Sequence, residues 1–189
     1  FSAADKVVGR ATAFLYCLLG VKTVYANVMS RPAAQVLESG GITAQWGKLV
    51  EGIINRIYEV NPVEFMIGSI GIDLTDTSED GLWMIKNYTG LDNADSITEA
   101  AFFEPMMGSI AYSMVAVKVA EGADIKAVAE GMKNGIDQRK WICVEADDLQ
   151  VVSCDDVVLL IMVGSETGMT SQSFVDAFAQ VCGGTVTTY

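Results

Sequence analysis

The sequence predicts an α+β fold, in which helices cover a mostly antiparallel sheet. Two observations predict it. The first is a strand-like run at 111–119 followed by an amphipathic helical segment that begins near Asp124. The second is a series of three further strand-like runs, at 141–145, 149–153 and 156–163. Residues 157–163 are all apolar, without alternation, which is typical of a strand that is covered on both faces. We therefore place this strand at the centre of the sheet.

The composition favours a folded domain that does not bind nucleic acid. The chain has 189 residues, of which 51% are hydrophobic, enough to build a core. Its net charge of −12 would repel a phosphate backbone. Histidine is absent, which excludes Ser-His-Asp and Cys-His catalysis and argues against an enzyme. Glycine patterns of dinucleotide-binding and P-loop sites are also absent.

The four cysteines, Cys17, Cys143, Cys154 and Cys182, lie far apart in the sequence and form no C-x-x-C pair. This spacing disfavours a zinc site and a thioredoxin-type motif. We expect buried thiols that pack as small hydrophobic groups. The disulfide state stays open, because Cys143 and Cys154 would approach each other if their strands were neighbours.

The first 40 residues are predicted to be a helical extension, and residues 41–189 the α+β domain. We expect one helix over residues 4–29, with Phe14, Leu15 and Leu18 along one side, stopped by Pro32. The alternative is a leader peptide, because basic residues precede an apolar run at 11–21 and a cleavage-like Val-Tyr-Ala at 24–26. The run is too short to span a bilayer.

Residues 43–105 are predicted to be mainly helical, with one extended segment. Thr43 is a candidate cap for a helix that runs to about Glu59, and residues 63–74 are expected to be extended. Two shorter helices are predicted at 82–88 and 92–103; Gly90 ends the first and Pro105 closes the second.

The rest of the chain is predicted from its caps and turns. Asp124 suits the N-cap of a helix, and polar turns at 146–148 and 154–155 suit hairpins. A last helix begins at Thr170 or Ser171, ends at Gly183, and precedes a polar tail.

The acidic loop at 76–87 is the candidate metal site. Asp76, Ser78 and Asp80, followed by Gly81, match the first half of an EF-hand loop, in which alternating oxygen ligands converge on calcium. Asn87 stands where that loop would place a bidentate glutamate. The alternative is an acidic turn that caps the following helix.

Two further groups of polar residues have a functional and a structural interpretation. The pairs at 147–148 and 155–156 would bring four carboxylates together if their turns lay at one edge, whereas successive hairpin turns usually lie at opposite ends. The sequence Arg139-Lys140-Trp141 would suit an anionic or glycan ligand. More often, such basic residues satisfy a helix C-terminus and the tryptophan is in the core.

A set of short motifs resembles an uncharacterised family of putative lipoproteins from Gram-positive gut bacteria. The motifs are Glu-Pro-Met-Met at 104–107, Ala-Tyr-Ser-Met at 111–114, the helix end at 132–137, Arg-Lys-Trp-Ile-Cys at 139–143, and residues 73–76 and 88–91. The resemblance covers about residues 45–182. It implies an extracytoplasmic protein tethered through a lipidated N-terminal cysteine, but the residues before Cys17 depart from a lipidation site.

We therefore expect a non-enzymatic, extracytoplasmic or surface-associated domain. Its role would be protein binding or self-assembly through the N-terminal helix, and membrane association is compatible with it. One alternative is a calcium-binding protein that uses Asp76, Ser78 and Asp80. Another is a carboxylate-dependent hydrolase, which needs two acids within about 10 Å of each other. The sequence assigns no catalytic or cofactor-binding residue.

Overall fold

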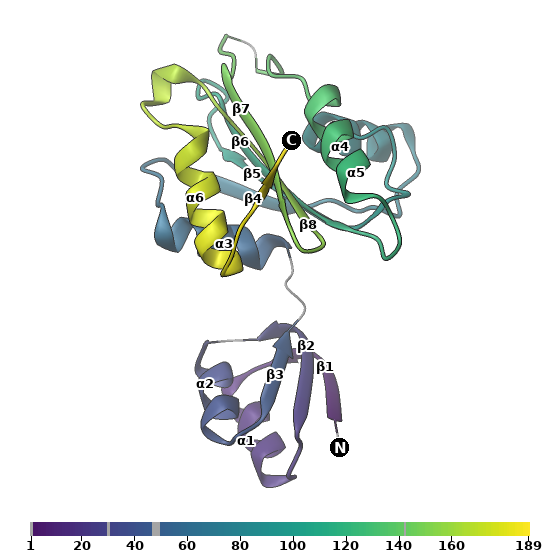
Figure 1. The fold of residues 1–189 in the computed structure, drawn as a ribbon, viewed down its shortest axis with the longest axis vertical. Helices are drawn as coiled ribbons and strands as arrows, with labels where there is room; N and C mark the ends of the chain where they lie inside the picture. The colour runs from purple at the N-terminus through teal and green to yellow at the C-terminus, as the bar shows by residue number, and fades with distance from the viewer. Residues whose placement is uncertain (1, 30, 47–49, 142) are drawn as a thin grey trace. The chain divides into compact units, whose positions relative to one another are not determined.

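The computed structural model describes residues 2–29, 31–46, 50–141 and 143–189. The chain divides into two compact units, residues 1–49 and 50–189 (Figure 1). The division falls after residue 49, whereas the predicted boundary is after residue 40.

The N-terminal unit is a small parallel sheet with two helices. Its elements are, in order, β1 (Ser2–Val8), α1 (Arg10–Leu18), β2 (Thr23–Met29), α2 (Arg31–Ser39) and β3 (Thr43–Trp46). The strands pair in the order β1-β2-β3, with Ala3 opposite Val24 and Val24 opposite Ala44. Its described core includes Val24 of β2, Ala13 of α1 and Leu37 of α2. Each crossover helix therefore packs on the sheet that it connects, as βαβ units do.

The predicted helix over residues 4–29 is wrong. Gly9 has an extended backbone at the N-cap of α1, and Gly20 has φ +68, so the helix is confined between them. The flanking segments contain the β-branched pairs at 7–8 and 23–24, which favour strands. Residues 24–26, the proposed cleavage site, lie inside β2.

The predicted helix from Thr43 also begins too early. Residues 43–46 form β3, and α3 (Val50–Val60) begins after residues 47–49, which lie outside the described part of the chain. Thr43 and Ala44 pair in parallel with β2, and this pairing makes the segment a strand. The prediction missed it because a capping pattern is local, whereas the pairing joins segments that are distant in the sequence.

The second unit is built on a six-stranded antiparallel sheet, which confirms the predicted α+β class. Its strands, in spatial order, are β4 (Ile67–Gly71), β5 (Ile97–Pro105), β6 (Tyr112–Val119), β8 (Val157–Val163), β7 (Asp148–Cys154) and β9 (Thr187–Thr188). β8 pairs with β6 and β7, and every one of its residues is buried. The uninterrupted apolar run is therefore an inner strand, as predicted.

Two helices cover each face of this sheet (Figure 1). On one face, α3 and α6 (Ser171–Cys182) pack against Leu159 and Ile161. On the other, α4 (Glu79–Thr89) and α5 (Ile125–Gly135) pack against Val158 and Leu160. Successive residues of β8 thus enter opposite cores, because side chains alternate along a strand.

Several predicted caps and turns are confirmed. Asp124 accepts hydrogen bonds from the backbone N–H groups of Lys126 and Ala127 at the start of α5. Gly90 ends α4 with φ +80, and Thr170 precedes α6. Asp155, with φ 51, makes the turn between β7 and β8. The extended segment at 63–74 contains β4.

Two predicted elements in the second unit are wrong. Residues 97–105, expected to be mostly helical, form β5 between β4 and β6. The prediction failed because a short apolar run fits the helical and the extended period equally well. Residues 141 and 143–145 form no strand. Gln138 closes this segment into a loop, since its carbonyl oxygen and side-chain amide both bond to the backbone of Ala146, at 2.9 and 2.8 Å.

The hairpin predicted at 146–148 is therefore absent, and β7 pairs with β8 and β9 instead. The predicted polar tail contributes β9 to the sheet, with Thr187 opposite Ser153.

Candidate functional site

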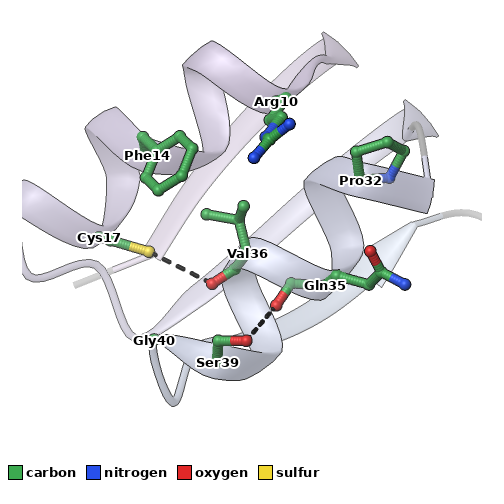
Figure 2. A pocket seen from close by; sticks show the side chains of 8 residues that line it. All are labelled: Arg10, Phe14, Cys17, Pro32, Gln35, Val36, Ser39 and Gly40. Atoms are coloured by element: carbon green, nitrogen blue, oxygen red, sulfur yellow. Dashed lines mark hydrogen bonds between the residues drawn. The ribbon is translucent and has the colours of Figure 1, made fainter.

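An open pocket of about 570 Å³ lies between α1 and α2 of the N-terminal unit (Figure 2). α1 lines it with Arg10, Phe14 and Cys17, and α2 lines it with Pro32, Gln35 and Val36. Most of these side chains are apolar, and Arg10 is the cation among them. This pocket was not predicted, because residues 10–18 were expected to lie within one long helix.

The base of the pocket is fixed by close packing between the two helices. A Cβ atom on Gly40 would lie 2.6 Å from the Sγ atom of Cys17, so a larger residue there would displace the thiol. The Cys17 thiol donates a hydrogen bond to the carbonyl oxygen of Val36 over 3.6 Å. On α2, the Ser39 hydroxyl donates to the Gln35 carbonyl oxygen at 2.7 Å. The thiol therefore already has a partner in the wall of the pocket.

Arg10 is the chemically distinctive residue of the pocket. Its guanidinium carbon is 5.9 Å from the centroid of the Phe14 ring, a cation–π distance. Among the ion pairs between described residues, none involves Arg10. Figure 2 shows Arg10 and Phe14 facing α2 across the pocket. The arrangement is an apolar pocket with an exposed cation at its edge.

Three large apolar side chains of α1 and that of its C-cap residue Leu19 are exposed, and one of them, Phe14, also lines the pocket. Phe14, Leu15, Leu18 and Leu19 are 49%, 56%, 83% and 62% exposed, and Ala13 is the buried residue of the helix. Residues 11–21 contain no charged side chain. These four residues, called the α1 apolar face below, come from the segment that the sequence indicated for protein contact, although α1 is shorter than predicted.

In the second unit, Lys140 forms a buried ion pair with Glu104. Their side chains are 5% and 18% exposed. The Lys140 ammonium lies 4.7 Å from the Tyr88 ring centroid and 5.5 Å from that of Trp141. Burial lowers the pKa of Lys140 below its usual value, and the charge of Glu104 opposes this shift without cancelling it. The Tyr88 ring in turn stacks on Phe102, with centroids 3.5 Å apart.

This cluster explains the Arg139-Lys140-Trp141 motif in structural terms. Lys140 holds the loop that follows α5 against Tyr88 of α4 and Glu104 of β5. Arg139 pairs with Glu145 inside the same loop. A depression of about 450 Å³ is lined by Arg139, Trp141 and Glu145, with Lys140 outside its lining. The sequence did not indicate Glu104 as the partner, since it precedes Pro105 at a strand end that was predicted to be helical.

The predicted metal ligands lie at the N-terminus of α4, where Ser78 caps the helix and Asp76 bonds to Ser78. Asp76 Oδ1 accepts a hydrogen bond from the Ser78 backbone N–H at 2.9 Å, and Ser78 Oγ accepts one from Gly81 at 3.1 Å. The bonds from Ser78 lower the pKa of the Asp76 carboxyl group. Asp80 lies in the first turn of α4. Within the described part of the chain, no three His, Cys, Asp or Glu residues are grouped to hold a metal. Calcium binding by Asp76, Ser78 and Asp80 stays a prediction.

The four turn aspartates do not gather at one edge. Asp148 lies opposite Val163 at one end of the β7–β8 hairpin, and Asp155 lies in the turn at the other end. Asp147 accepts a hydrogen bond from Ser165 N–H at 2.7 Å, and Asp148 accepts one from Ser171 N–H at 2.7 Å. The first pair therefore anchors the segment that leads into α6. The cysteines were predicted to be buried thiols, but Cys143 is exposed and Cys17, Cys154 and Cys182 are half-buried.

The fold and sites define an α+β protein of two units, with an apolar helix face and pocket in the first. Residues 2–71 match the model of a family described as TM1506, a domain of unknown function (DUF1893). The match covers β1 to β3 and continues through α3 and β4. The chain is therefore similar to this uncharacterised family over less than half of its length. No curated protein and no solved structure matches significantly. In the described residues, no helix is both long and apolar enough to span a membrane.

Proposed function

We propose that the protein acts in protein binding, and that the α1 apolar face mediates self-assembly with a second copy. The observation that carries the proposal is the exposure of Phe14, Leu15, Leu18 and Leu19 on one short helix. An extracytoplasmic or surface-associated location, implied by the resemblance over residues 45–182, is part of the same proposal.

The energetic reason is the apolar surface that the helix leaves in water. Burying a leucine or phenylalanine side chain completely contributes roughly 1.5–3 kcal/mol, so covering four half-exposed ones contributes on the order of 4 kcal/mol. Contiguous apolar patches of this kind mark interaction sites on soluble proteins.

The charge distribution favours a second copy as the occupant. The α1 apolar face has no charged residue, so two copies related by a two-fold axis meet without like-charge contacts. The acidic charge lies elsewhere. Residues 1–49 contain five basic and two acidic residues, whereas residues 50–189 contain seven basic and 22 acidic ones. The repulsion expected from a net charge of −12 is therefore concentrated outside the unit that makes the contact.

The experiment is light scattering coupled to size exclusion over a concentration series of the full chain. We expect the mass to rise from 20.2 kDa toward twice that value as concentration increases. The double variant Leu15→Glu, Leu18→Glu should stay monomeric, because the contact would place like charges against each other. Its far-UV circular dichroism should match the parent, since both side chains are exposed.

The matched control is Met106→Glu, Met107→Glu, which adds the same two charges to side chains that are 70% and 64% exposed in the second unit. This variant should assemble like the parent chain. A parent that is monomeric at every concentration would contradict the proposal, and so would assembly that survives in the α1 variant but is lost in the control variant.

A further inference from the structure

We propose that the pocket between α1 and α2 binds a small amphipathic anion, an apolar chain or ring that carries one carboxylate. This ligand site goes beyond the proposed self-assembly through the α1 apolar face, with which it shares Phe14.

The size and lining of the pocket suit an apolar small molecule. Its volume of about 570 Å³ lies within the range of roughly 300–1,000 Å³ that is usual for ligand sites. Phe14 on one side and Pro32 and Val36 on the other supply the apolar walls. Cys17 and Gly40 also line the pocket and lie close together, so the apolar part of a ligand would rest against the thiol.

Arg10 determines the charge of the ligand. Its guanidinium group forms no ion pair with a described carboxylate, and it lies beside the ring that forms one wall. A guanidinium group presents a planar fork of donors that matches the two oxygens of a carboxylate. With one cation among the described residues of the lining, a single carboxylate fits better than a polyphosphate.

The surroundings of the pocket do not oppose an anion. The acid of α2, Glu38, is exposed and does not line the pocket. The excess of basic over acidic residues in the sequence 1–49 also favours a negatively charged ligand. The polar side chains across from Arg10 are those of Gln35 and Ser39, which are uncharged.

Cys17 provides a direct readout of occupancy. In a variant that retains this thiol alone (Cys143→Ser, Cys154→Ala, Cys182→Ala), the rate of alkylation by iodoacetamide reports access to the base of the pocket. We expect octanoate to slow the alkylation in a saturable manner. Octanamide has the same chain without the charge. It should give the same protection only at roughly tenfold higher concentration, because it lacks the charge-assisted hydrogen bond to Arg10.

Two substitutions in the full chain separate the role of Arg10 from a general charge effect. Arg10→Met should weaken octanoate binding about tenfold and abolish the preference over octanamide. Lys22→Met removes a base of the same unit that does not line the pocket, and should leave binding unchanged. Calorimetric titration of octanoate into the unmodified chain gives the same affinity without the cysteine substitutions.

Equal protection by octanoate and octanamide would overturn the proposal, as would equal weakening by Arg10→Met and Lys22→Met, or the absence of both heat and protection. The outcome is separable from self-assembly, because Leu15 and Leu18 do not line the pocket. Octanoate should therefore still bind to the Leu15→Glu, Leu18→Glu variant.

Discussion

At the scale of single residues, the Lys140–Glu104 pair shows how a loop without regular structure is held in place. The pair lies under Tyr88 and Trp141 and is almost completely removed from water. Glu104 Oε1 has no other partner among the described residues. A buried pair of this kind gains little net free energy while both charges are present, because desolvation offsets their attraction. Loss of one partner leaves the other charge buried and unpaired.

We therefore expect Lys140→Met to lower the free energy of unfolding by about 3 kcal/mol. The double variant Lys140→Met, Glu104→Leu should recover a large part of that loss, because no charge is left in the apolar site. Urea unfolding of the full chain, followed by tryptophan fluorescence, measures both. Equal losses in the single and double variants would mean that the lysine acts through packing alone.

At the scale of elements, two glycines allow α4 and α5 to approach each other closely. A Cβ atom on Gly135 would lie 2.0 Å from the carbonyl oxygen of Gly90, and one on Gly90 would lie 2.5 Å from that of Met132. The end of α4 thus rests on the last turn of α5. This contact sets the position of Tyr88, and with it one wall of the Lys140 cluster.

Gly135→Ala should lower the free energy of unfolding by about 2–3 kcal/mol, because the clash is with backbone atoms that cannot rotate away. Gly131→Ala in the same helix is the control. Its Cβ would meet only the flexible Leu91 side chain, at 3.2 Å. Alanine favours the helix by up to about 1 kcal/mol, so this variant should be as stable as the parent or more so. Thermal unfolding of both variants measures the difference. Similar losses of stability in the two variants would contradict the explanation by close approach of α4 and α5.

At the scale of the whole molecule, the two compact units have cores of different extent. The described core of residues 1–49 is a single cluster around Val24, Leu37 and Ile42. Residues 50–189 have two clusters, one on each face of the six-stranded sheet. A domain of about 50 residues buries a smaller fraction of its surface and is correspondingly less stable.

We therefore expect hydrogen exchange to show two cooperative units. In increasing urea, at protein concentrations below self-assembly, the amides of β2 should lose protection before those of β6 and β8. At higher concentration the protection of β2 should rise, since assembly through the α1 apolar face stabilises the folded state of that unit. Simultaneous loss of protection in β2 and β8 at low concentration would show that the chain unfolds as one unit.

The candidate functional residues were predictable only in part. The apolar character of residues 11–21 follows from the sequence, because no neighbour is needed to recognise an uncharged apolar run; their role in protein contact is a proposal. The pocket required the pairing of α1 with α2. The partner of Lys140 required the strand β5. The acidic loop caps α4, as one of the two interpretations predicted, because a cap is a local contact; calcium binding by this loop stays a prediction.

The sequence by itself determined the α+β class, the inner strand at 157–163, and helix ends such as those at Asp124 and Gly90. Each depends on a short-range property. The inner strand is an apolar run without alternating polar residues, the Asp124 side chain caps its own helix, and Gly90 ends its helix with a positive φ. Only the tertiary structure decided that residues 2–8, 23–29 and 97–105 are strands. Short apolar segments satisfy helical and extended periods alike, and hydrogen bonds to strands distant in the sequence select between them.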